Sequence, residues 1–211
     1  MTVTWYGQAC FRLEGKDTRV LIDPFEGKIG LRAPRINDQI ICVTHEHYDH
    51  NNVEGASPET FVICGPGEYE KSSVQIVGVG SYHDNNHGAD RGLNTIYVIK
   101  FEDITLCHLG DLGQSELSDE QIETIGGVDI LFVPVGGTYT IDGKQAVGIV
   151  KQIEPKIIIP MHYKVPGLNI DLDGPNTFLK EIAIKPEEVE SFKIQSKNLP
   201  QEEMRLITFT L

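Results

Sequence analysis

The stretch His45-Glu46-His47-Tyr48-Asp49-His50 follows directly after the apolar run Ile40-Ile41-Cys42-Val43. The apolar run predicts a buried strand, so the polar stretch begins where that strand ends. Imidazole nitrogens and carboxylate oxygens are the donors that borderline divalent metals such as zinc prefer. The alternative is a polar loop with solvated histidines, but this spacing rarely arises by chance in a chain with 7 histidines. The stretch is therefore predicted to bind metal.

Further donor residues follow other predicted strands along the chain. Because loops at strand ends gather at one rim of a sandwich of two sheets, these residues are expected to meet the first motif. One of them, His83, has an alternative in His87, which lies in the same polar loop. The candidate metal ligands are His45, His47, Asp49, His50, His83, Asp111 and His162.

This set contains more donors than one metal ion needs. A structural zinc ion is held by four ligands, so an excess of histidines and aspartates predicts two ions with one carboxylate between them. His108 lies three residues before Asp111 and is interpreted as a partner of a ligand, not as a ligand.

The composition is that of an ordinary globular protein, with 211 residues, 40% hydrophobic and 23% charged. Its length suits one domain over residues 1–211. No apolar run approaches the roughly 20 residues that cross a bilayer. The N-terminus lacks the basic and apolar regions of a signal peptide. We therefore expect a cytoplasmic protein that does not engage a membrane.

The net charge of −13 disfavours nucleic acid as a partner, because no cluster of lysine and arginine offsets it. A small-molecule substrate is expected instead, and the sequence is compatible with a homo-oligomer. The cysteines form no C-x-x-C pair and lie in or beside apolar stretches, so buried free thiols are expected. They are Cys10, Cys42, Cys64 and Cys107.

Strands dominate the first half of the chain, and strands alternate with helices in the second half. Ser118 is predicted to begin one helix through a capping box, Asp142 to cap a second that runs through Ile153, and a third is predicted near residues 177–183. A short helix from Asn51 and a turn over residues 65–70 are also expected. The pattern predicts an α/β (α+β) sandwich of two mixed sheets packed face to face with helices outside.

The string H-x-H-x-D-H after a hydrophobic strand resembles the signature of the metallo-β-lactamase superfamily, whose members are mostly dinuclear metallohydrolases. Other matching stretches resemble a compact subgroup of Zn-dependent hydrolases related to ascorbate-6-phosphate lactonase. The resemblance implies a four-layer αββα sandwich with the metals at the shared edge of the sheets. The matching stretches are Gly65–Glu70, Arg91–Asn94, His108–Gly113, Pro134–Thr140 and Pro160–Tyr163.

The resemblance also implies roles for individual residues. Asp23 would brace the histidine loop without binding metal, and Asp111 would bridge the two ions. The first metal would be held by His45, His47 and His83, and the second by Asp49, His50 and His162.

Together these features predict a dinuclear hydrolase, with zinc or manganese, that cleaves a small ester, lactone or phosphodiester through a metal-activated water. Asp49 or Asp111 would accept a hydrogen bond from the nucleophile and shuttle its proton. Arg91 would bind a phosphate or carboxylate of the substrate, or form a surface ion pair. Tyr139 lies in a stretch that lines the substrate pocket or forms a simple turn. The alternatives are a nuclease-type phosphodiesterase and a non-catalytic binding module that keeps its metals for stability.

Overall fold

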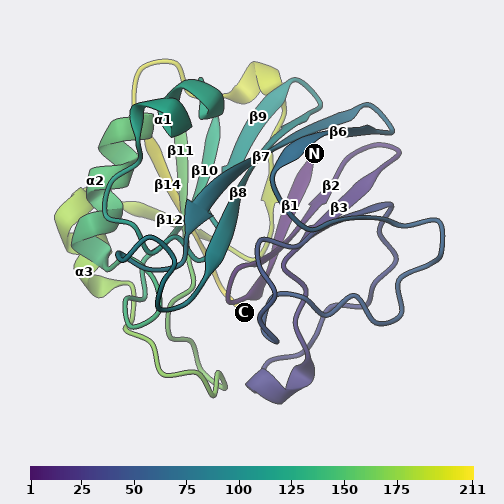
Figure 1. Ribbon diagram of the computed structural model, residues 1–211. Helices are drawn as coiled ribbons and strands as arrows, with labels where there is room; N and C mark the ends of the chain where they lie inside the picture. Colours follow the sequence, from purple (N-terminus) through teal and green to yellow (C-terminus); the bar gives the residue numbers. More distant parts are fainter.

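The computed structural model describes residues 1–211 as two mixed β-sheets with a shared core (Figure 1). The first sheet has the order β13-β1-β2-β3-β4-β5, antiparallel from β13 to β3 and parallel from β3 to β5. Its strands are β1 (Thr2–Gly7), β2 (Cys10–Glu14), β3 (Arg19–Ile22), β4 (Ile40–Cys42), β5 (Phe61–Ile63) and β13 (Phe192–Lys193).

The second sheet has the order β12-β14-β11-β10-β9-β8-β7-β6. It is parallel from β12 to β9 and antiparallel from β9 to β6. Its strands are β6 (Gly67–Lys71), β7 (Val74–Tyr82), β8 (Leu93–Phe101), β9 (Ile104–His108), β10 (Ile130–Pro134), β11 (Ile157–Met161), β12 (Pro186–Val189) and β14 (Arg205–Phe209).

The strand directions explain why distant donors meet. Strands β9, β10 and β11 are parallel to one another, and β7 runs in the same direction because β8 is antiparallel to both β7 and β9. Their carboxyl ends therefore lie at one edge of the sheet. His83, Asp111 and His162 follow β7, β9 and β11 and so reach this edge.

The α-helices stand beside the eight-stranded sheet (Figure 1). They are α1 (Asp119–Ile125), α2 (Gly143–Ile153) and α3 (Asn176–Ile182), and two short 3-10 helices cover Gly27–Ile29 and Ser196–Asn198. The expected capping box of α1 is present at Ser118, and Asp142 caps α2. No helix of the structure has the length and apolar character needed to cross a membrane.

The two sheets share a cluster of 59 buried hydrophobic residues. They are also joined directly by hydrogen bonds from β8 to the end of β4. The Thr95 backbone N–H donates to the Thr44 carbonyl at 2.9 Å. The buried Tyr97 hydroxyl donates to the Val43 carbonyl at 2.8 Å. These bonds fix the loop after β4 against the eight-stranded sheet.

Three expectations about local structure are wrong. No helix begins at Asn51, because the Asn52 backbone N–H donates to the Pro24 carbonyl and ties the segment to the end of β3. Residues 67–71 form the edge strand β6 in place of a turn, since they pair with β7. Cys64 is exposed, whereas the other three cysteines are buried as expected.

Candidate metal centre

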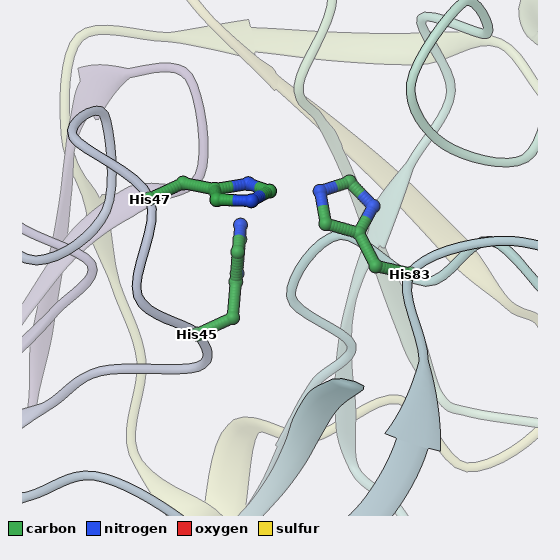
Figure 2. Close-up of side chains that lie close together, drawn as sticks. All are labelled: His45, His47 and His83. Atoms are coloured by element: carbon green, nitrogen blue, oxygen red, sulfur yellow. The ribbon is translucent and has the colours of Figure 1, made fainter. Parts of the chain in front are cut away.

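Two loops bring three histidine rings together at the edge of the sandwich, in edge-on and tilted arrangements. His45 and His47 come from the loop after β4, and His83 comes from the loop after β7 (Figure 2). Their ring centroids lie 4.5 to 5.0 Å apart, and one ring nitrogen from each lies within 4.8 Å of the others. His87, the alternative to His83, is exposed and packs on the ring of Tyr82.

A second group of donors adjoins the first. The ligand atoms of Asp49, His50 and His162 also lie within 4.8 Å of one another. Asp49 Oδ2 lies 3.5 Å from His50 Nε2. The side chains of His50 and His162 are buried.

Asp111 lies between the two groups and faces both of them. Its Oδ2 atom is 3.5 Å from His83 Nε2 and 3.1 Å from His162 Nε2. It is also 3.3 Å from His50 Nε2 and 3.9 Å from His45 Nε2. The structure thus brings together all the candidate ligands, which we call the donor cluster: His45, His47, Asp49, His50, His83, Asp111 and His162.

Asp23 and Thr44 determine which ring nitrogens face the donor cluster. Asp23 is fully buried, and its carboxylate accepts hydrogen bonds from the Thr44 backbone N–H and the Thr44 hydroxyl. The same carboxylate lies 3.0 Å from His50 Nδ1, which therefore carries the proton. Because the Thr44 hydroxyl hydrogen is used by Asp23, its oxygen accepts from His45 Nδ1 at 3.0 Å. Both rings therefore face the donor cluster with Nε2, which offers a lone pair when the ring is neutral.

These lone pairs have no hydrogen-bond donor. His45 Nε2 and His50 Nε2 are buried and make no hydrogen bond, and the same holds for one carboxylate oxygen of Asp111. An unpartnered buried acceptor is costly, so an electron-pair acceptor is expected among them. Imidazole nitrogens with carboxylate oxygens form a donor set that suits zinc. The residues present therefore fit divalent cations.

The protonation states of His45, His83 and Asp111 agree with this chemistry. Burial, with the neighbouring His50, lowers the pKa of His45 to about 2. Burial also lowers the pKa of His83. Burial alone would raise the pKa of Asp111, but His162 and His50 outweigh it and hold the pKa well below its usual range. Neutral imidazoles and an ionised carboxylate are the forms that bind metal. Burial alone would lower the pKa of His50, but Asp111 and Asp23 outweigh it and hold the pKa well above its usual range, so His50 must release a proton when a cation binds.

The loop that carries Asp111 is held by Asn94 on β8. The Asn94 side-chain carbonyl accepts from the Asp111 backbone N–H at 3.0 Å, and its amide donates to the Leu109 carbonyl. Gly110 has φ +56°, and a Cβ there would lie 2.3 Å from Asn94 Oδ1 and 2.8 Å from Thr44 Cβ. Only glycine allows this close approach of the two sheets beside Asp111.

Gln8, in the turn between β1 and β2, is a residue of the site that the sequence did not single out. Its side-chain Nε2 lies 3.0 Å from Asp49 Oδ2 and 2.9 Å from His162 Nε2. Its backbone carbonyl accepts from the His162 backbone N–H at 3.1 Å. A polar residue between two apolar strands is typical of a turn, so the sequence carried no signal for this placement.

His108 lies beneath the donor cluster and does not reach into it. The ring is fully buried, with Nε2 at 2.9 Å from the Ala9 carbonyl and Nδ1 accepting from the Gly110 backbone N–H. His108 therefore joins the turn that carries Gln8 to the turn that carries Asp111. The role of His108 as a partner of a ligand stays a prediction.

Arg91 and Tyr139, the predicted substrate contacts, lie against each other. The Arg91 guanidinium carbon is 4.8 Å from the Tyr139 ring centroid, and its Nη2 donates to the Thr138 carbonyl. Arg91 has no carboxylate within 4.0 Å, so the predicted alternative of a surface ion pair is absent. The pair joins the loop after β7 to the loop after β10.

A surface hollow of about 860 Å³ lies elsewhere and is not lined by the donor cluster. It is lined by Tyr82, Asn94, Gln121 and other polar residues between β7 and the segment before α1. The convergence of donors, and not the size of a cavity, therefore identifies the candidate site.

Comparison with known proteins agrees with the fold and the donor motif. A family profile described as "Beta-lactamase superfamily domain" matches residues 2–162. The match covers most of the chain, which therefore belongs to the metallo-β-lactamase superfamily. It is a metal-dependent hydrolase of that superfamily.

Two relatives above 30% identity extend over most of the chain. A crystal structure from Thermotoga maritima, provisionally described as a Zn-dependent hydrolase of the same superfamily, is 34% identical and has a TM-score of 0.81. The match covers 99% of this chain and 98% of that one. A UPF0173 metal-dependent hydrolase of Thermoplasma volcanium is 32% identical, over 76% of this chain and 82% of the relative.

A more distant structure shares the fold alone. The isothiocyanate hydrolase from Delia radicum gut bacteria is 14% identical with a TM-score of 0.67 and covers 93% of this chain. The expected fold, superfamily and hydrolase class are thus confirmed.

Proposed function

We propose that the chain is a dinuclear hydrolase that acts on a small ester, lactone or phosphodiester. The position of Asp111 is the observation that supports two ions. One carboxylate oxygen faces His83 from the first group of donors and His50 and His162 from the second, at 3.1 to 3.5 Å. A carboxylate that lies between two sets of imidazoles can bind two cations at once.

Divalent cations held in the donor cluster would lower the pKa of water towards neutrality and polarise the scissile group. Asp49 would then accept the proton of the nucleophile. Burial alone would raise the pKa of Asp49, but the contacts with His50 and Gln8 outweigh it and hold the pKa well below its usual range. Asp49 is therefore ionised at neutral pH and able to orient a proton donor. The Oδ1 atom of Asp111 has no hydrogen-bond partner. Asp111 would therefore be the alternative acceptor of this proton.

Arg91 supports a substrate that carries a negative charge. The guanidinium is exposed and unpaired, and it is held in place by the Thr138 carbonyl and the Tyr139 ring. A positioned guanidinium binds phosphate and carboxylate groups through paired hydrogen bonds. In a chain of net charge −13, such a group on the loop that carries His83 would offset the repulsion of an anionic substrate.

We further propose zinc as the metal, with manganese as the alternative, because imidazoles make up most of the donor set. The free cysteines support the cytoplasm as the location. The continuous cluster of 59 buried hydrophobic residues supports one domain over residues 1–211.

Metal analysis and an activity panel test the proposal. Purified protein should carry about two zinc ions per chain and turn over anionic esters, lactones or phosphodiesters faster than neutral ones. Asp111→Asn should abolish turnover while the circular dichroism spectrum is retained. Two bound ions without turnover of any class would favour a binding module. Salt-dependent RNA binding would favour a nuclease-type phosphodiesterase.

A further inference from the structure

The side chain of Gln8 is buried against the donor cluster, and only one end of its amide group has hydrogen-bond partners. Its exposed fraction is 0%. Its Nε2 atom lies within 3.0 Å of both Asp49 Oδ2 and His162 Nε2, whereas its Oε1 atom is buried and has no hydrogen-bond partner. A buried amide group whose oxygen makes no hydrogen bond requires an explanation beyond packing.

The turn itself does not require this side chain. The contacts that fix the turn are made by the Gln8 backbone, whose carbonyl accepts from Trp5 Nε1 and from the His162 N–H. The backbone has φ +54°, a left-handed conformation that asparagine or glycine adopts more readily than glutamine. The presence of glutamine at this position is therefore explained by its side-chain contacts with Asp49 and His162, and not by the turn.

The distances around Gln8 are those of donors around one cation. Two donor atoms about 2.05 Å from one ion are about 2.9 Å apart when they form a right angle, and about 3.3 Å apart at the tetrahedral angle. The Gln8 amide terminus is 2.9 Å from His162 Nε2 and 3.0 Å from Asp49 Oδ2. The separation of Asp49 Oδ2 from His50 Nε2, 3.5 Å, is slightly longer than this range.

The chemistry of the amide decides which of its ends faces the donors. An NH₂ group directed at Asp49 and His162 uses the lone pairs that a cation needs. Rotation about the terminal C–C bond exchanges Oε1 and Nε2 and moves no other atom. The oxygen then joins the carboxylate of Asp49 and the ring nitrogen of His162 as a third donor.

We propose that Gln8 is a further ligand of the metal centre and donates its side-chain oxygen to the cation held by Asp49, His50 and His162. This inference rests on the proposed dinuclear function. It adds the β1–β2 turn of the six-stranded sheet to the site, beside the loop after β4 that supplies Asp49 and His50.

Metal titrations of variants test this assignment without an activity assay. The probes are Zn²⁺ in competition with a chromophoric chelator and Co²⁺ followed by its visible absorption, with Gln8→Leu, Gln8→Glu and wild-type protein. Gln8→Leu should bind one ion as the wild type does and the other about 10- to 100-fold more weakly. Gln8→Glu keeps an oxygen at the same place, so it should bind that ion at least as tightly as the wild type and change the Co²⁺ spectrum.

A control variant, Gln121→Leu, removes a buried amide that caps α1 outside the donor cluster and should leave both affinities unchanged. Equal or tighter binding in Gln8→Leu would overturn the assignment. If Gln8→Leu does not fold, Gln8→Glu decides the question, because loss of the second ion in that variant would also overturn it. A wild-type protein that binds fewer than two ions would instead contradict the dinuclear function.

Discussion

Asp23 shows how a residue without a proposed ligand role can determine the chemistry of a site. Its carboxylate lies 3.0 Å from His50 Nδ1 and accepts from the Thr44 hydroxyl, which in turn faces His45 Nδ1. One buried charge therefore fixes the tautomers of two rings in the donor cluster. The sequence suggested this bracing role only through the resemblance to the superfamily, because a strand-end aspartate alone is typical of a turn.

Asp23→Asn should weaken metal binding while the donor cluster keeps its residues. An amide cannot accept from the Thr44 N–H, the Thr44 hydroxyl and His50 Nδ1 together, so the orientation of both rings is less well defined. We expect the dissociation constant for Zn²⁺ to rise about 10- to 100-fold in a chelator competition assay. Asp38→Asn is the control, because Asp38 is also buried but pairs with Arg12 before β4. Equal affinities for Asp23→Asn and the wild type would contradict the role of Asp23.

His108 makes the stability of the fold depend on pH. Burial lowers its pKa below the ordinary value of 6.5. Well above pH 6.5, His108 is neutral in both the folded and the unfolded chain. Below pH 6.5, the unfolded chain binds a proton at His108 that the folded chain does not bind. The free energy of unfolding therefore falls as the pH falls. His108→Gln removes this difference. The fall in the urea midpoint between about pH 7.5 and pH 5.5 should be smaller in His108→Gln than in the wild type, measured with excess chelator. The same fall in both proteins would contradict the explanation.

At the scale of elements, the apolar runs predicted strands well because burial sets both their composition and their ends. The apolar run at residues 40–43 predicted β4 (Ile40–Cys42), and α2 begins after Asp142 as its capping pattern indicates. Two of the failures have a common cause, which is hydrogen bonding to another segment: a distant one at Asn52, and the neighbouring strand β7 at β6. β6 looked like a turn from its glycine and proline, but pairing with β7 makes it an edge strand.

The loop between β7 and β8 is organised by a single carboxylate. Asp84 Oδ1 accepts from the N–H groups of Asn86 and Gly88, and Oδ2 accepts from those of Asp90 and Arg91. Burial alone would raise the pKa of Asp84, but these bonds outweigh it and lower the pKa to about 2. The loop is therefore ordered at neutral pH, with His83 at one end and Arg91 at the other.

Asp84→Asn should loosen this loop without loosening the sheets. Asparagine has one acceptor oxygen in place of two, so about half of the bonds to the loop are lost. We expect amide hydrogen exchange over residues 85–92 to become about tenfold faster, while exchange in β7 and β8 is unchanged. Asp129→Asn is the matched control, since Asp129 accepts from the Thr105 N–H at the opposite edge of the sheet. Uniform acceleration across the sheet would mean that Asp84 supports the whole fold.

At the scale of the whole molecule, the donor cluster lies across the boundary between the two sheets. His45, His47, Asp49 and His50 follow a strand of the six-stranded sheet, and His83, Asp111 and His162 follow strands of the eight-stranded sheet. The sequence predicted that these residues meet, because each follows an apolar strand. It did not predict the inter-sheet contacts of Thr44, Tyr97 and Gln8, since these depend on the register in which the sheets pack.

Chelation should therefore lower the stability of the protein as a whole. A cation that binds only the folded chain adds about 4 kcal/mol at a free concentration about 1,000 times its dissociation constant. For a chain of this length that corresponds to a fall in Tm on the order of 10 °C when the metal is removed. Scanning calorimetry with and without excess chelator measures the difference.

Tyr97→Phe separates this effect from the direct bonds between the sheets. The variant loses the hydroxyl that donates to the Val43 carbonyl and accepts from the Gly65 N–H, but it keeps the donor cluster. Its Tm should be lower than that of the wild type in both conditions, by the equivalent of about 1–3 kcal/mol. The fall on chelation should be the same in both proteins, because cations held by the donor cluster would bridge the sheets independently of the hydroxyl. A protein whose Tm does not change when its metal is removed would not use the donor cluster to hold the sheets together.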